Sequence, residues 1–173
     1  MKNDYANRLS RYVTAMRNKQ PDRVPFRPFA AELTATLTHR TCQQVTHEYQ
    51  EAFEAIIETC KMFQCDAIPA SMVYVWTGLT QSLGLKYYGI PGIDVPPTTG
   101  FQYIEPSEEN AFMKEDEYDE LIDDPTAFLY NKWLPRVSTK IGGANEFERT
   151  AAIVKGSSDM LEYFSALART FRE

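Results

Sequence analysis

The sequence has few of the features that mark secreted, membrane-spanning or nucleic-acid-binding proteins. Its 173 residues include three cysteines, an odd number that argues against a disulfide framework and favours a reducing cytoplasm. No apolar run approaches the roughly 20 residues that span a bilayer, and the charged residues 1–11 do not resemble a secretory signal. The net charge is −6 without any basic block, which disfavours a nucleic-acid surface. We therefore expect a cytoplasmic protein with no membrane or nucleic-acid partner.

Several catalytic and ligand-binding motifs are also missing from the sequence. Residues 89–92 (GIPG) have the wrong spacing for a phosphate-binding or dinucleotide motif, and no Ser/His/Asp triad can be defended. Ten acidic residues lie between positions 105 and 124, but they lack the ordered spacing of a calcium loop. We interpret this segment as a solvated helical face.

Apolar residues that recur at helical spacing predict two helices in the first third of the chain. The first begins near Tyr5 and must end before Pro21. The second covers residues 46–63, with an apolar stripe opposite an acidic face. Short apolar runs at residues 24–32 and 66–76 predict buried strands, the first of which contains two prolines that cannot donate ladder hydrogen bonds. A strand, a long helix and a second strand form a βαβ unit with parallel strands.

The remaining chain is predicted to change character twice. Residues 84–106 combine glycine, proline and short aromatic runs, which predicts a hairpin-like excursion. Residues 107–173 are predicted to be mainly helical, with Asp124 and Pro125 suited to begin a helix. In the last helical stretch, residues 156–158 (GSS) predict a division into two helices. We therefore expect one domain, in which residues 1–83 hold the first helix and the βαβ unit.

The order of these segments resembles the N-terminal half of the uroporphyrinogen decarboxylase superfamily. The resemblance rests on a first helix with RL at 8–9 and MR at 16–17, then PDRVP at 21–25, CDAI at 65–68, LGL at 83–85, EYDELI at 117–122 and DP at 124–125. It implies an α/β fold, the N-terminal portion of a TIM-type (β/α)8 barrel with an excursion after the second strand. Eight strand–helix units need about 250 residues. We therefore expect an incomplete barrel that pairs with a second copy or with a complementary half-barrel.

Two departures favour the methyltransferases of that superfamily over its decarboxylases. The decarboxylases carry an arginine-rich, RQAGRY-like stretch after the first strand, where residues 26–32 here read FRPFAAE. They also carry an aspartate after an FSD-like run at the second strand, where Ser71 is here followed by Met72. The resemblance therefore implies part of a corrinoid-linked or thiol-directed methyltransferase, with a small-molecule substrate and a corrinoid protein as partner. Two alternatives stay open, namely a carboxy-lyase of porphyrin biosynthesis and a non-catalytic half that needs a partner chain.

Candidate site residues follow from the rule that chemistry sits at the C-terminal ends of parallel strands. Glu32, after the first predicted strand, is a candidate general base. Arg27 lies within an apolar run, where a guanidinium either pairs with a structural carboxylate or grips an anionic ligand. Tyr74 and Trp76 end the second predicted strand and are candidates for substrate binding. Ordinary packing for the aromatics, and a helix cap or loop charge for Glu32, are the structural alternatives.

The loop before the second helix supplies the last candidates. His39 and Arg40 are assigned to substrate binding, with a plain surface loop as the alternative. His39 and Cys42 invite a zinc site, but zinc needs three or four ligands, and His47 joins them only if the loop folds back. The resemblance implies zinc ligands in the C-terminal half of a complete barrel. We therefore assign no metal or other cofactor to this chain.

Overall fold

The computed structural model describes residues 2–68, 76–143 and 145–171, and these residues are mostly helical. The elements are α1 (Lys2–Met16), α2 (Leu33–Leu37), α3 (Cys42–His47), α4 (Tyr49–Phe63), α5 (Thr77–Leu83), β1 (Tyr88–Gly89), β2 (Gln102–Tyr103), the 3-10 turns η1 (Glu108–Asn110) and η2 (Glu115–Glu117), α6 (Tyr118–Asp123), α7 (Pro125–Phe128), the π-helical segment η3 (Leu129–Trp133), α8 (Leu134–Val137), α9 (Thr139–Gly142) and α10 (Glu146–Thr170).

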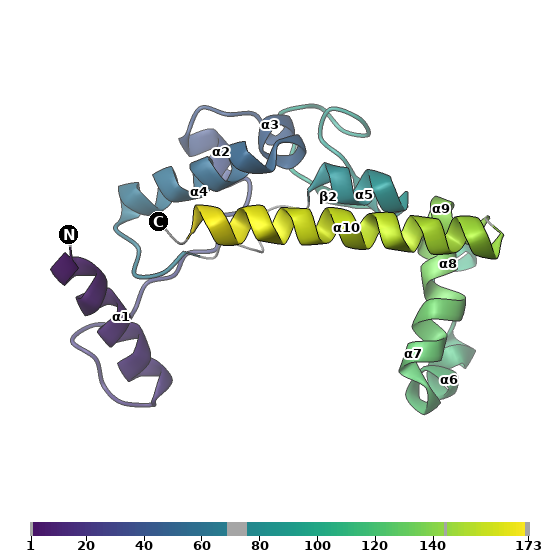
Figure 1. Ribbon diagram of the computed structural model, residues 1–173, viewed down its shortest axis with the longest axis horizontal. Coiled ribbons are helices and arrows are strands. Elements are labelled where there is room, and N and C mark those ends of the chain that lie inside the picture. Colours follow the sequence, from purple (N-terminus) through teal and green to yellow (C-terminus); the bar gives the residue numbers. More distant parts are fainter. Residues whose placement is uncertain (1, 69–75, 144, 172–173) are drawn as a thin grey trace.

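The helices form an arch (Figure 1). The long helix α10 spans the arch, and we call it the beam. Helices α2, α3, α4 and α5 form a layer over it, which we call the upper layer. Helix α1 descends at one end and α6, α7 and α8 descend at the other. We call these two descending parts the α1 arm and the α6–α8 arm.

Local capping explains where the helices over the beam begin and end. Thr41 accepts a hydrogen bond from the backbone N–H of Gln44, and the Gln44 side chain in turn accepts one from the Thr41 N–H, which together form a capping box for α3. Helix α4 ends where Gln64 takes a left-handed conformation with φ of 50°. The side chain of Asp124 accepts a hydrogen bond from the Ala127 N–H at the start of α7, which confirms the helix start predicted at Asp124 and Pro125.

The main buried cluster lies within the upper layer, among α2, α3 and α4. Small and branched apolar side chains fill it, from Ala35, Val45, Ala52, Ala55, Ile56, Cys60 and Cys65. An aromatic cluster then joins the upper layer to α10. Phe53 is fully buried, and its ring centroid lies 5.6 Å from that of Tyr163 and 5.7 Å from that of Phe171. Burial of apolar surface against α10 therefore holds the arch together.

The prediction of an α/β fold and of a TIM-type barrel portion is wrong. Within the described residues the paired strands are β1 and β2, which are two residues each and antiparallel. Residues 24–32, predicted to be a buried strand, form an irregular segment on which Val24 is 84 % exposed. Pro25 and Pro28 lack the N–H groups that a ladder requires. Residues 69–75 of the second predicted strand lie outside the described residues, and its described ends, 66–68 and 76, are not part of a strand, although the Asp66 N–H donates to the Phe26 carbonyl.

The predicted break at residues 156–158 is also wrong, because α10 runs through it as one helix of 25 residues. Gly156 is buried against α5. A Cβ placed there would lie 2.9 Å from Cγ of Leu83 and closer still to its Cδ2. The glycine therefore allows two helices to approach closely and does not end one. Within the described residues, no helix has the combined length and apolar character that crossing a bilayer requires.

Candidate functional site

Among the described residues, the carboxylate of Asp66, just after α4, accepts more hydrogen bonds than any other carboxylate. Arg11 of α1 donates to its Oδ1 at 2.6 Å, and Arg23 donates to both oxygens at 2.7 and 2.8 Å. The backbone N–H of Phe26 donates to Oδ2 at 2.8 Å, and the Asp66 N–H donates back to the Phe26 carbonyl at 2.8 Å. Arg11 also forms a bidentate pair with Asp22. We call this set the Asp66 network.

Burial and hydrogen bonding act in opposite directions on this carboxylate. The Asp66 side chain is 0 % exposed, while that of Arg23 is 50 % exposed. Burial alone would raise the pKa of Asp66, but hydrogen bonds from Phe26, Arg11 and Arg23 outweigh it and hold the pKa below its usual value. Asp66 is therefore charged at neutral pH and ties α1 and the irregular segment to the end of α4.

The two predicted catalytic residues lie apart from this network. Arg27 is exposed, and among the described residues it forms no hydrogen bond or ion pair. It is therefore not the buried guanidinium that the apolar run suggested. The Glu32 carboxylate accepts a hydrogen bond from the Phe101 N–H at 3.1 Å, which fastens the start of α2 to the excursion at 84–106. Among the described residues, no hydrogen bond or ion pair joins Arg27 to Glu32.

Arg40 has a structural role that the sequence prediction missed. Its guanidinium pairs with Glu51 at 2.6 Å, with Glu58 at 3.1 Å and with Glu54 at 3.2 Å, all on the outer face of α4. The hydrogen bonds that Arg40 donates to Glu58 and Glu51 raise the pKa of Arg40 above its ordinary value. Glutamates three and four residues apart on a helix share a face, so the spacing of these acids could have indicated a shared cation.

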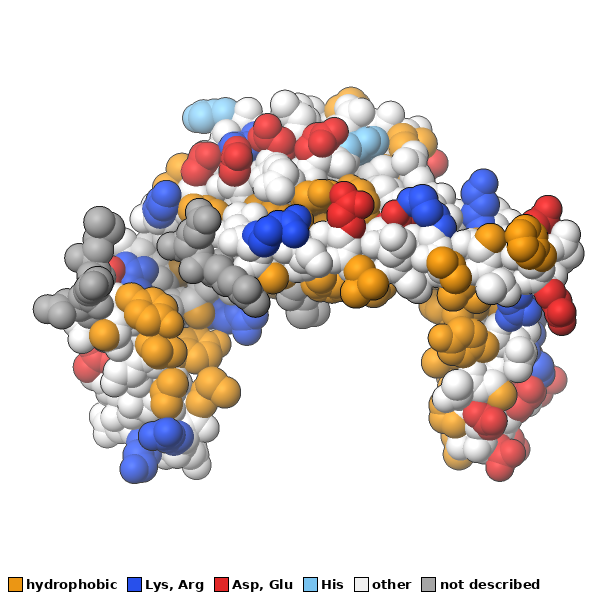
Figure 2. Space-filling model, in the orientation of Figure 1, with side chains coloured by type: hydrophobic (Ala, Val, Ile, Leu, Met, Phe, Trp, Pro, Cys, Tyr) orange, Lys and Arg blue, Asp and Glu red, His pale blue; other side chains and the backbone are white. Residues whose placement is uncertain are grey.

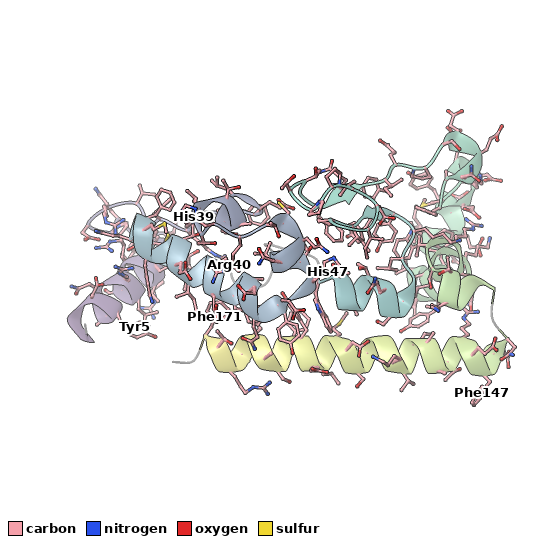
Figure 3. All side chains as sticks on the ribbon, turned by 90° about the horizontal axis from the view of Figure 1, so that it is seen from above. Tyr5, His39, Arg40, His47, Phe147 and Phe171 are labelled. Carbon is pink, nitrogen blue, oxygen red and sulfur yellow. The ribbon has the colours of Figure 1, made fainter. Side chains whose placement is uncertain are left out.

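The remaining predicted residues do not converge on one point. His39 is exposed in a left-handed turn with φ of 58°, and Figure 3 shows His39, Arg40 and His47 spread along the upper layer. The Trp76 indole donates to the His47 carbonyl at 3.2 Å and stacks on Tyr163 with centroids 5.9 Å apart. Trp76 is therefore a half-buried member of the aromatic cluster that contacts α10. Tyr74 lies outside the described residues.

No metal centre forms from the histidines and cysteines that the structure describes. In residues 2–68, 76–143 and 145–171, no group of three His, Cys, Asp or Glu side chains has a geometry that would hold an ion. Cys42 donates its thiol to the Thr98 carbonyl at 3.4 Å, and a ring nitrogen of His47 lies 2.9 Å from the Pro91 carbonyl oxygen. These two side chains fasten α3 to the excursion.

An aromatic pocket that the sequence prediction missed lies where the excursion meets the α6–α8 arm. It has a volume of about 460 Å³ and is lined by Tyr87, Tyr103, Glu105, Pro106, Glu108, Ala111, Phe112, Met113 and Trp133. The aromatic runs at residues 86–88 and 101–104 were visible in the sequence, but their meeting with Phe112 and Trp133 depends on tertiary structure. Comparison with known protein families, with curated proteins and with solved structures finds no match for this chain.

Proposed function

We propose that this chain takes part in methyl transfer to or from a small molecule, as the resemblance to the uroporphyrinogen decarboxylase superfamily implies. The Asp66 network supports the proposal. Residues 21–25 carry the most specific part of the resemblance, and they contact residues 65–68, another segment of it, through the bidentate pair of Arg23 with Asp66. A chance similarity in two separate segments would not require them to bond to one another.

Methyl transfer fits the charged groups better than decarboxylation of a porphyrinogen does. A substrate with several carboxylates needs free guanidinium groups to bind it. The partly buried arginines are already neutralised, Arg11 by Asp22 and Asp66, and Arg136 by Glu117. Arg40 is likewise held by three glutamates. The exposed Arg27 is one remaining candidate for an anionic group of a smaller substrate.

A second candidate function is a docking module that completes its fold on another polypeptide. Its support is the amount of apolar surface that the described residues expose, with large side chains on both arms and on the beam, including Tyr5, Leu9, Met16, Ile122, Phe147, Val154 and Leu161. Contiguous exposed apolar surface marks interaction sites in soluble proteins. The two functions are compatible, because an enzyme assembled from several polypeptides needs such contacts.

The test uses the tagged chain isolated from its own cells with the polypeptides bound to it. The preparation is mixed with methylcobalamin and a simple thiol without oxygen, and the loss of the methyl–cobalt bond is followed by visible absorbance. In this reaction the thiolate takes the methyl group and cobalt keeps the electron pair, leaving the thioether and cob(I)alamin. We expect transfer that Glu32→Gln and Arg27→Ala each lower at least tenfold.

The matched control is Glu115→Gln, which removes an exposed carboxylate of the acidic segment and should leave the rate unchanged. A stable assembly without methyl transfer would contradict the enzymatic proposal and favour the docking module. Steady formation of coproporphyrinogen from uroporphyrinogen by the same preparation would instead favour the carboxy-lyase alternative.

A further inference from the structure

The aromatic pocket is built around one central ring. The centroid of Tyr87 lies 6.1 Å from the ring centroids of Tyr103, Phe112 and Trp133, with interplanar angles of 48°, 65° and 44°. The rings come from the approach to β1, from β2, from the loop after η1 and from the end of η3. All four rings line the pocket.

Polar contacts hold the walls of this pocket in place. The Ile104 N–H donates to the Tyr87 carbonyl at 2.8 Å, which continues the pairing of β1 with β2. On the opposite wall, Arg136 donates to the Phe112 carbonyl at 3.1 Å and to both oxygens of Glu117 at 2.6 Å. The pocket is therefore fixed before any ligand binds, which reduces the entropy that binding costs.

The charged side chains that line the pocket are both negative. Glu105 and Glu108 line it, and their carboxylates form no ion pair or hydrogen bond with the residues that the structure describes. No lysine or arginine is among the lining residues. Of the cations nearby, Arg136 pairs with Glu117 and Lys114 donates to the Glu109 carbonyl at 2.8 Å, while Lys86 lines an adjoining pocket together with Pro106 and Phe112. Burial first, and then the neighbouring Tyr88, raises the pKa of Tyr87 to about 12, so the central ring carries no charge at neutral pH.

We propose that this aromatic pocket binds a small methylated ammonium cation, such as a choline-like head group. Aromatic faces attract cations through their quadrupoles, and quaternary ammonium groups are the ligands that clusters of such faces recognise. A quaternary ammonium has no N–H groups, so it needs no hydrogen-bond acceptors in the pocket. Glu105 and Glu108 add longer-range attraction. An inorganic cation would instead need several oxygen ligands.

Proton NMR of the two indole N–H groups gives a direct test with an internal control. The resonance of Trp133, assigned with Trp133→Phe, should shift and saturate as tetramethylammonium or choline is added. The resonance of Trp76, which does not line the pocket and whose indole N–H is bonded to the His47 carbonyl, should not move. The neutral isostere 3,3-dimethylbutan-1-ol has the shape of choline without its charge, and it should bind at least tenfold more weakly.

Paired variants locate the site. Tyr103 is 63 % exposed, so Tyr103→Leu should leave the fold intact and weaken choline binding about three- to tenfold. Tyr118→Leu, at an exposed tyrosine outside the pocket, should have no effect. The double change Glu105→Gln and Glu108→Gln should weaken binding and reduce its salt dependence, while Glu115→Gln should not. Thermal melts of each variant establish that it is folded.

Three results would overturn the inference. Equal affinity for choline and its neutral isostere would make the pocket a simple apolar groove. Equal shifts with potassium chloride would mean general attraction to an acidic surface. A folded chain with no saturable shift up to about 0.1 M choline would mean that no useful site exists. None of these results would decide the methyl-transfer proposal, because the measurement involves no reaction.

Discussion

Helix α10 crosses α5 at Gly156. If this crossing is as close as the structure has it, replacing Gly156 by alanine should destabilise the fold, whereas the same change in an exposed helix stabilises it. In an exposed helix, replacing glycine by alanine stabilises by about 1 kcal/mol. At Gly156 the new Cβ would lie 2.9 Å from Cγ of Leu83 and closer to its Cδ2. Overpacking of this kind costs about 1–3 kcal/mol. The clash therefore exceeds the gain in helix propensity, and we expect Gly156→Ala to lower the free energy of unfolding by about 1 kcal/mol.

The same substitution should change sign when Leu83 is shortened. In a Leu83→Ala background the space above Gly156 is free, so Gly156→Ala should stabilise by about 1 kcal/mol. The double-mutant cycle then gives a coupling of about 2 kcal/mol between the two positions. Urea unfolding followed by circular dichroism measures all four proteins. In thermal melts, each 1 kcal/mol corresponds to roughly 2–4 °C for a chain of this size.

A neighbouring residue provides the control. Ser157 is exposed on α10, so Ser157→Ala should be neutral or slightly stabilising within a continuous helix. If residues 156–158 instead ended one helix and capped another, loss of the cap hydroxyl would cost about 1 kcal/mol. A stabilising Gly156→Ala in the wild-type background, with no coupling to Leu83, would refute the close crossing of α5 and α10.

Four further predictions concern charge, metal and assembly. Asp66→Asn should lower the free energy of unfolding by about 1–3 kcal/mol, toward the low end because Arg23 is half exposed. The wild type should lose this contribution as pH falls through the lowered pKa of Asp66, so acid titrations of the two proteins should converge. Hydrogen bonds from Arg136 and the Lys114 N–H lower the pKa of Glu117 from 4.5 to about 2. Stability from this carboxylate should therefore be lost between about those pH values, and Glu117→Gln should remove that dependence. Elemental analysis should find no stoichiometric zinc, and one zinc per chain that Cys42→Ala removes would contradict this. Light scattering should detect dimers or larger assemblies, and a monomer that binds no hydrophobic dye would count against the exposed apolar surface.

The sequence was a good guide where one periodic pattern determined one element. The stripe that predicted a helix over residues 46–63 corresponds to α4, with a separate short helix α3 before it. Short apolar runs were a poor guide, because such a run suits a buried strand, an extended segment or a helix equally well. Residues 24–32 became an irregular segment since two prolines and the missing strand neighbours removed the hydrogen bonds that a strand requires.

The candidate site was harder to predict because its residues take their roles from tertiary contacts. Arg40 looked like a loop residue until three glutamates of α4 were found around it. Trp76 looked like a substrate-binding side chain, yet it stacks on Tyr163, which lies 87 positions away in the sequence (76 to 163). No local pattern contains such information, and the aromatic pocket depends on four separate segments in the same way.

The described chain pairs Arg11, Arg40 and Arg136 internally and leaves much of its apolar surface exposed, and this contrast bears on the kind of partner that it can bind. Burying one large apolar side chain contributes about 1.5–3 kcal/mol, while association costs at least about 4 kcal/mol before any contact is made. A partner must therefore cover several exposed side chains at once. Figure 2 shows apolar side chains on the inner sides of both arms and beneath the beam. These elements carry large exposed apolar side chains, among them Met16 of α1, Ile122 of α6 and Leu161 of α10. A convex partner that entered the arch would contact both arms and the beam together, and so would cover several of these side chains at once.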